Sequence, residues 1–167
     1  MIVIPAKIND RGVSPLRMGA TVKRMLAVLV AMVAVAAGVT ISAPAAQAAI
    51  SCSGTIIYDQ VQSSGLGELV IYYNSSNGGT NSACFYHHGA SYGVSAPTFV
   101  AIYRCEERSN EGAACTHTGS PGSQSGDFSY YAGPVGVTGV ADYCVEAMGQ
   151  IVWGGEAHWI YSRRQGC

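Results

Sequence analysis

The feature that most restricts the fold of this 167-residue chain is the placement of its cysteines, because all of them lie in the last 118 residues. The six are Cys52, Cys84, Cys105, Cys115, Cys144 and Cys167. An even number of cysteines in an exported chain predicts a disulfide framework. Their spacing matches no zinc-finger pattern, so three disulfides are favoured over a metal site.

The first 49 residues predict an export signal that the mature protein would not keep. Lys23 and Arg24 precede an uncharged apolar run over residues 25–39. This run of 15 residues is short for a membrane span, which needs about 20, and it suits the apolar part of a signal peptide. Small residues follow and place the start of the mature chain at Ala49 or Ile50. A retained membrane anchor is the alternative.

Residues 50–167 have the length of a single domain. Met18 stands close before the signal and could be the true start, which would make residues 1–17 a mis-annotated extension.

The mature chain carries four arginines, no lysine and nine carboxylates, which gives a formal net charge of −5. Such a domain lacks the basic surface that binds phosphates, so we expect neither nucleic acid nor membrane as a partner of the mature form.

Short runs rich in Val, Ile, Tyr, Thr and Phe predict strands. The runs cover residues 55–62, 68–74, 82–88, 98–105, 128–137, 142–153 and 157–163. The run at 142–153 also contains fair helix formers, and the polar stretch 106–126 predicts a long surface loop. The strongest turn is 75–81, where Asn-Gly-Gly favours positive φ angles. Short strands separated by glycine turns predict an all-β fold, a small disulfide-stapled β-sandwich or barrel.

The stretch "DFSYYAGPVGV" at 127–137 combines two tyrosines with a proline inside a strand-like run. Pro134 cannot donate to a strand ladder, so it predicts an edge, a bulge or a strand start. Tyr130 and Tyr131 are neighbours, so their side chains point to opposite faces and at most one is expected in the core. The displayed tyrosine is a candidate ligand contact, although a packed or solvated ring is favoured.

No pattern of catalytic residues stands out in the sequence. The nearest approach to a nucleophile elbow, "GSQSG" at 122–126, has Gln124 where the serine should stand. His87 and His88 face opposite ways in a strand, so surface histidines are favoured over a shared metal ion. We therefore predict no catalytic residue, cofactor or metal ligand.

A short charged run offers a second candidate surface, formed by Glu106, Glu107 and Arg108. Paired carboxylates can supply acid–base chemistry, but charge beside a disulfide loop is usually solvated surface. The ten tyrosines, together with Trp153 and Trp159, favour either a binding surface or an aromatic core, and we favour the core.

Several blocks resemble the actinobacterial spore-associated protein family, whose members are small exported proteins. The resemblance rests on "VIYYNSSNG" at 70–78 closely followed by Cys84, on "GDFSYYAGPVGV" at 126–137, and on "YCVEAMGQI" after it. It implies a protein found with spores or cell surfaces and implies no reaction. Cys105, Cys115 and the ending "HWIYSRRQGC" depart from the family pattern.

The resemblance also guides the expected disulfides, because Cys105 and Cys115 are absent together from the family pattern and so are expected to pair. The other four cysteines can pair in three ways, and we favour Cys84 with Cys144 and Cys52 with Cys167. The second bridge would tie the two ends of the mature chain and so close the longest loop, which constrains the unfolded chain most.

We expect a secreted protein, retained at a spore or cell surface, that acts as a structural or binding protein without catalysis. Its partner would be a cell-wall or spore-surface component or another secreted protein. One alternative is a secreted inhibitor or binding module that uses the loop from Cys105 to Cys115. The other is a hydrolase of unrecognised type.

Overall fold

A computed structural model describes residues 50–167, and the signal expected at 1–49, with its extension at 1–17, lies outside the described residues. The described chain forms eight strands: β1 (Thr55–Val61), β2 (Gly67–Asn74), β3 (Thr80–His87), β4 (Ala96–Cys105), β5 (His117–Phe128), β6 (Tyr131–Thr138), β7 (Val145–Trp153) and β8 (Glu156–Tyr161). Two four-stranded sheets result, sheet A in the order β1-β2-β3-β6 and sheet B in the order β5-β4-β7-β8. Every pairing is antiparallel. The predicted all-β sandwich is confirmed, whereas the sheets do not close into a barrel.

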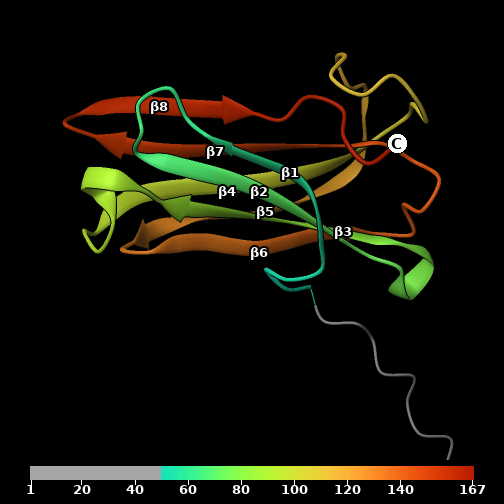
Figure 1. The fold of residues 1–167 in the computed structure, drawn as a ribbon, viewed down its shortest axis with the longest axis horizontal. Helices are drawn as coiled ribbons and strands as arrows, with labels where there is room; N and C mark the ends of the chain where they lie inside the picture. The colour runs from blue at the N-terminus through green and yellow to red at the C-terminus, as the bar shows by residue number, and fades with distance from the viewer. Residues whose placement is uncertain (1–49) are drawn as a thin grey trace, which may run out of the picture. The chain divides into compact units, whose positions relative to one another are not determined.

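The strands run lengthwise, so the turns gather at the two ends of the domain (Figure 1). One end, called here the C-terminal end, holds the segments 75–79, 106–116 and 139–144 together with the tail 162–167. The other, called the Tyr130 end, holds the turns at 62–66, 88–95, 129–130 and 154–155.

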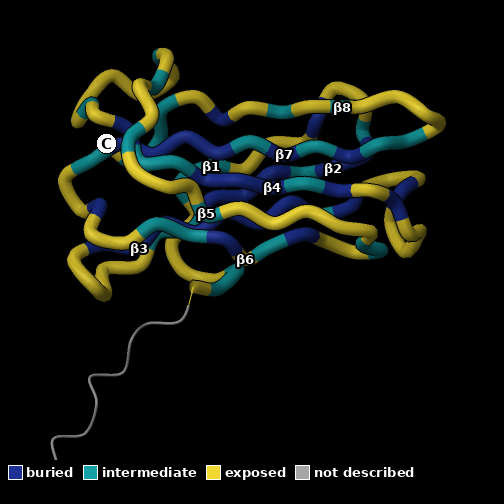
Figure 2. The backbone as a smooth tube through the Cα atoms, turned by 180° about the vertical axis from the view of Figure 1, so that it is seen from behind, coloured by how far each residue is buried: buried dark blue, intermediate teal, exposed yellow. Residues whose placement is uncertain are grey.

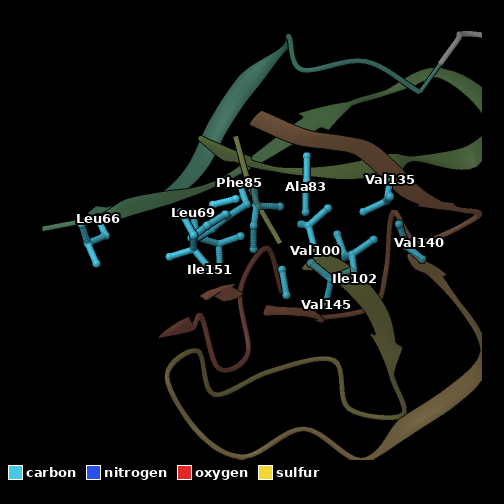
Figure 3. Packing of buried hydrophobic residues seen from close by; sticks show 14 residues of the cluster. Leu66, Leu69, Ala83, Phe85, Val100, Ile102, Val135, Val140, Val145 and Ile151 are labelled. Atoms are coloured by element: carbon cyan, nitrogen blue, oxygen red, sulfur yellow. The ribbon is translucent and has the colours of Figure 1, made fainter. Parts of the chain in front are cut away.

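The core lies between the sheets and is built from alternate residues of their strands (Figure 3). Phe85 of β3 is the largest side chain that is completely buried. Its ring packs against Gly67 of β2 and Gly149 of β7, where a Cβ atom would collide with it. Glycine at both positions is therefore required by packing, and these contacts join the two sheets at the middle of the core.

Most predicted strands are confirmed, including β7, whose composition also suited a helix. The prediction of a surface loop over 106–126 is wrong for its second half, because residues 117–128 form β5. This strand pairs along its length with β4, and most of its residues are exposed (Figure 2). An edge strand with little buried surface needs few apolar residues. The sequence of β5 is therefore rich in Ser and Gly, and this composition is typical of a loop.

The prediction for Pro134 is confirmed, because it lies in β6 at the edge of sheet A and at a bulge. Between the pairs Phe85–Ala132 and Ala83–Val135, β6 has two residues, Gly133 and Pro134, where β3 has only Cys84. The missing N–H of proline therefore falls where the ladder is already interrupted.

The three disulfides join Cys52 with Cys84, Cys105 with Cys115, and Cys144 with Cys167. The prediction of the Cys105–Cys115 bridge is confirmed, and the other two pairings are wrong. The chain tail returns beside the start of β7, where Gln165 forms a bridge with Val145, and this places Cys167 next to Cys144. Local strand register, rather than the length of the closed loop, therefore decides the pairing.

No cysteine is left free, and three disulfides suggest an oxidising environment of the extracellular type. Within residues 50–167, no helix has the length and apolar character needed to cross a membrane.

Candidate binding surface

The outer face of sheet B carries a group of solvent-exposed aromatic rings. Trp159 and Tyr161 alternate along β8, so both point outward, and their side chains are 44% and 49% exposed. Their rings are nearly parallel, with centroids 5.9 Å apart, and Phe99 of β4 meets the Trp159 ring edge-on at 6.2 Å. These three residues are called here the aromatic platform. Large aromatic groups on a sheet face are suited to contact a ligand that lies flat on the surface.

A shallow hollow of about 230 Å³ adjoins the platform at Phe99. Its wall includes Ser125 and Asp127 from β5 and Gln150 from β7, so hydroxyl, carboxylate and amide groups lie beside the rings. Gln150 is also the strand neighbour of Trp159. The hollow is smaller than the 300–1,000 Å³ of typical cavities that enclose a small molecule. The arrangement therefore suits part of a longer ligand better than an enclosed one.

The same outer face ends in a histidine–glutamate pair near the C-terminal end. The Nε2 atom of His117 lies 2.6 Å from a carboxylate oxygen of Glu146, which is buried. The His117 ring also stacks on Tyr103, with centroids 4.0 Å apart. Cys115 lies close enough to join these two residues around an ion, but its sulfur is in a disulfide and is a poor ligand. Ring stacking and the bond to Glu146 both fix the imidazole in place.

The outer face of sheet A also carries tyrosines, but here they bind one another. The hydroxyls of Tyr72 and Tyr86 are 3.0 Å apart, and Tyr131 packs against Tyr86 with centroids 5.6 Å apart. Burial and the bond to Tyr72 raise the pKa of Tyr86 far above its ordinary value. Hydroxyls that are already paired have fewer bonds to offer a ligand.

The remainder of this face is partly acidic and partly covered, and Ile56 and Val61 of β1 are exposed on it. The pKa of Glu68 is raised by burial, by a hydrogen bond with Asp59 and by the charge of that carboxylate. The segment that precedes β1 crosses β3, where Ser82 donates a 2.7 Å hydrogen bond to the carbonyl of Ser51, and the Cys52–Cys84 disulfide anchors it. The tyrosine hydroxyls of this face are therefore less free to bind a ligand than the aromatic side chains on the outer face of sheet B.

The candidate tyrosines Tyr130 and Tyr131 are both exposed, at 55% and 45%, so neither enters the core. Tyr130 meets Tyr92 edge-on at the Tyr130 end, whereas Tyr131 lies on the outer face of sheet A. The charged run 106–108 lies at the C-terminal end, a β4 length of roughly 30 Å away. The structure therefore does not join the predicted residues into one surface.

Within the charged run, Glu106 is exposed and Glu107 organises the loop. The Glu107 carboxylate accepts hydrogen bonds from the backbone N–H and the hydroxyl of Thr116, and it lies 3.7 Å from Arg164. The backbone bond from Thr116 is the main cause that lowers the pKa of Glu107. Arg108 donates a 2.6 Å hydrogen bond to the hydroxyl of Tyr143.

The loop between Cys105 and Cys115 is also tied to the chain tail. Arg164 donates hydrogen bonds to the carbonyls of Ser109 and Ala114, and the backbone N–H of Cys167 donates to Glu111. The loop is thus held at its middle as well as at its two ends.

The prediction of surface histidines holds for His88 but is wrong for His87, which is only 3% exposed. The two His87 ring nitrogens lie 3.1 Å from the Ser91 carbonyl and 2.8 Å from the Thr98 hydroxyl. His87 therefore links sheet A to sheet B at the Tyr130 end. Both partners follow closely in the chain, since Ser91 is four residues and Thr98 is eleven residues after His87. The strand pattern around His87 does not predict that the chain folds back over its ring.

The preference for an aromatic core is wrong for Trp159 and for most of the ten tyrosines, since none of them is a buried core residue. Of the tyrosines and tryptophans, only Tyr58, Tyr143 and Trp153 pack partly against the core. A signal for the exposure of Trp159 was present in "AHWIY", where Trp and Tyr alternate with Ile160. In a strand with one buried face, Ile160 and the two aromatic residues must point to opposite sides.

Comparison with protein-family models, with curated proteins and with solved structures finds no match to this chain. The likeness to the actinobacterial spore-associated family therefore stays a prediction from the residues.

Proposed function

We propose that this protein is a secreted, non-catalytic binding module that attaches to a neutral polysaccharide of a cell or spore surface through the outer face of sheet B. The observation that carries the proposal is the exposure of Trp159 and Tyr161 beside Phe99. Sugar rings have apolar C–H faces that stack on aromatic rings and hydroxyls that need polar partners. The platform supplies the first kind of contact, and Gln150 and the adjoining hollow supply the second.

Charge supports a neutral ligand. The net charge of −5 over residues 50–167 repels polyanions, which argues against nucleic acids and strongly acidic polymers. Asp127 at the hollow can accept hydrogen bonds from sugar hydroxyls without facing a second negative charge.

Export and surface retention fit this proposal. The three disulfides suit an extracellular environment, and the resemblance to spore-associated proteins implies the same location. The groups that could serve catalysis have structural partners, since His87 joins the two sheets and His117 is bound to Glu146. We therefore favour binding without turnover over the hydrolase alternative.

The inhibitor alternative is less favoured because of how its loop is held. Arg164 binds the loop at Ser109 and Ala114, and Arg108 is engaged with Tyr143. Binding to a protease in an extended form would require several of these contacts to break.

The test is affinity electrophoresis of residues 50–167 through gels that contain neutral polysaccharides such as cellulose derivatives, xylan or soluble glucans. We expect retarded migration of the native domain in at least one gel. Trp159→Ala should abolish the retardation, because loss of a central aromatic contact typically costs about 2 kcal/mol or more.

The matched control is Tyr130→Ala, which removes an aromatic ring of 55% exposure at the Tyr130 end. This variant should migrate as the native domain does. Equal loss in both variants, or stoichiometric inhibition of a secreted protease by both, would contradict the proposal.

A further inference from the structure

A pair of arginines at the C-terminal end has no carboxylate partner. Arg104 and Arg108 both place their guanidinium groups over Tyr143, with their carbons 4.7 and 4.2 Å from the ring centroid. Across residues 50–167, carboxylates pair only with Arg164 and His117. The two arginines thus lack a counter-charge in a domain that has nine carboxylates.

The two charges lie close enough to repel each other. Each guanidinium is in contact with the same ring, so their separation cannot exceed the sum of the two distances above. This is comparable with the Debye length of about 8–10 Å at physiological salt, and the repulsion is therefore not fully screened. An anion bound beside them would relieve it.

Arg104 is held in one orientation. Its Nε–H donates a 3.1 Å hydrogen bond to the hydroxyl of Thr118, and the Tyr143 ring covers one side of the guanidinium plane. The guanidinium has five N–H donors in a rigid fork, and the bond to Thr118 uses one. The terminal N–H groups have no protein acceptor among the hydrogen bonds of the described chain.

Arg104 also lines a hollow of about 410 Å³ between β5 and β6. The other lining residues include Ser120 and Thr138, which carry hydroxyls, together with Gly122 and with Thr118, whose hydroxyl is bonded to Arg104. The two strands approach closely there, because a Cβ on Gly122 would lie 2.6 Å from the carbonyl oxygen of Gly136. Like the hollow at Phe99, it is shallow and open to solvent, so it can contact one side of a small polar ligand.

We propose that this hollow binds the carboxylate of a small polar ligand, such as a sugar acid. The carboxylate accepts two parallel hydrogen bonds from the Arg104 fork, Arg108 adds positive charge, and the hydroxyls of the hollow bind the rest of the ligand. A monovalent carboxylate matches one fork, whereas a phosphate dianion requires more donors and faces stronger repulsion from the net negative domain. The site is separate from the aromatic platform, so the proposal does not rest on polysaccharide binding.

Heteronuclear NMR titration of residues 50–167 tests the proposal, with sodium glucuronate, sodium acetate, inorganic phosphate and glucose as probes at matched sodium concentration. We expect glucuronate to shift the Arg104 Nε–H and the Gly119 and Gly122 amides, with a Kd in the millimolar range. Acetate should shift the same signals more weakly, and glucose should leave them unchanged. Phosphate binding more tightly than glucuronate would overturn the choice of carboxylate.

Two variants distinguish bidentate hydrogen bonding by the Arg104 guanidinium from nonspecific attraction by positive charge. Arg104→Lys keeps the charge but loses the fork, and it should raise the Kd for glucuronate at least about tenfold. Arg163→Gln removes an exposed arginine of the same end and should leave the Kd within about twofold. Equal weakening by both variants, or glucuronate shifts that avoid the Arg104 signals in the native domain, would overturn the proposal.

Discussion

The outer faces of the two sheets both carry aromatic rings, but they differ in what those rings already bind. On sheet A, the Tyr72 and Tyr86 hydroxyls bind each other, and the segment before β1 covers part of β3. On sheet B, Trp159 and Tyr161 are exposed, and neither side chain has a hydrogen-bond partner within residues 50–167. Exposure alone therefore does not identify a binding surface, because the polar atoms of the rings must also be free.

The largest effect is expected when the outer face of sheet A is uncovered by removing its disulfide. Replacing Cys52 and Cys84 together by alanine frees the segment before β1 and should lower the free energy of unfolding by about 3 kcal/mol. Polysaccharide binding should stay unchanged, because the aromatic platform lies on the other sheet. Urea denaturation and affinity electrophoresis of the variant measure the two quantities. New polysaccharide binding by the uncovered face would contradict the statement that the two faces differ in their ability to bind a ligand.

The next test uses two tyrosines of similar exposure, one from each face. Tyr161→Ala should weaken polysaccharide binding by about 1–2 kcal/mol, because it removes a ring of the platform. Tyr131→Ala should change binding little, since this ring packs against Tyr86. Isothermal titration with a soluble oligosaccharide gives both affinities. The reverse order of effects would assign the ligand to sheet A.

The paired hydroxyls of sheet A predict a smaller effect on stability. Tyr72→Phe removes the 3.0 Å bond to Tyr86 and should lower the free energy of unfolding by about 1 kcal/mol. The pKa of Tyr86 should also fall, because the bond to Tyr72 helps to raise it. Thermal unfolding and an ultraviolet titration of the tyrosines check these outcomes. An unchanged Tyr86 titration would contradict a role of Tyr72 and would leave burial, Tyr131 and Glu68 as the causes of the raised pKa.

The smallest effect is a pH dependence of sheet A. The folded domain holds the Glu68 proton more tightly than the unfolded chain does, since the folded pKa is raised from 4.5. The contribution of Glu68 to stability therefore falls as pH rises from that value through the folded pKa, and the loss persists at neutral pH. Glu68→Gln should flatten this part of the stability curve and slightly stabilise the domain at pH 7. Identical pH profiles of variant and native domain would contradict the assignment.

Much of the fold could be predicted from the sequence because branched and aromatic residues mark β-strands directly. Pro134 indicated an edge and a bulge for the same reason, since its backbone chemistry is local. Strand β5 was missed because its ladder with β4 depends on backbone bonds, which leave no apolar pattern. Properties that depend on a residue and its neighbours can be predicted from the sequence, whereas the pairing of a strand with a distant strand cannot.

The candidate binding surface likewise has one feature that the sequence predicts and others that it does not. The outward direction of Trp159 follows from its alternation with Ile160, but its grouping with Phe99 depends on two strand pairings across β7. The Cys144–Cys167 bridge depends likewise on the return of the tail beside Val145. The role of Glu107 was hidden because Thr116 and Arg164 come from separate segments.

Ligand binding to the outer face of sheet B can be followed in one NMR spectrum with the two tryptophans of the chain, Trp153 and Trp159, as reporters. Trp153 packs against the core and Trp159 is exposed on the outer face of sheet B, so each indole N–H reports on a different environment. During titration with an oligosaccharide of a neutral polysaccharide that retards the domain in gels, we expect a shift of the Trp159 indole signal and a nearly constant Trp153 signal. A constant Trp159 signal together with shifts at Tyr86 and Tyr131 would contradict binding at the outer face of sheet B.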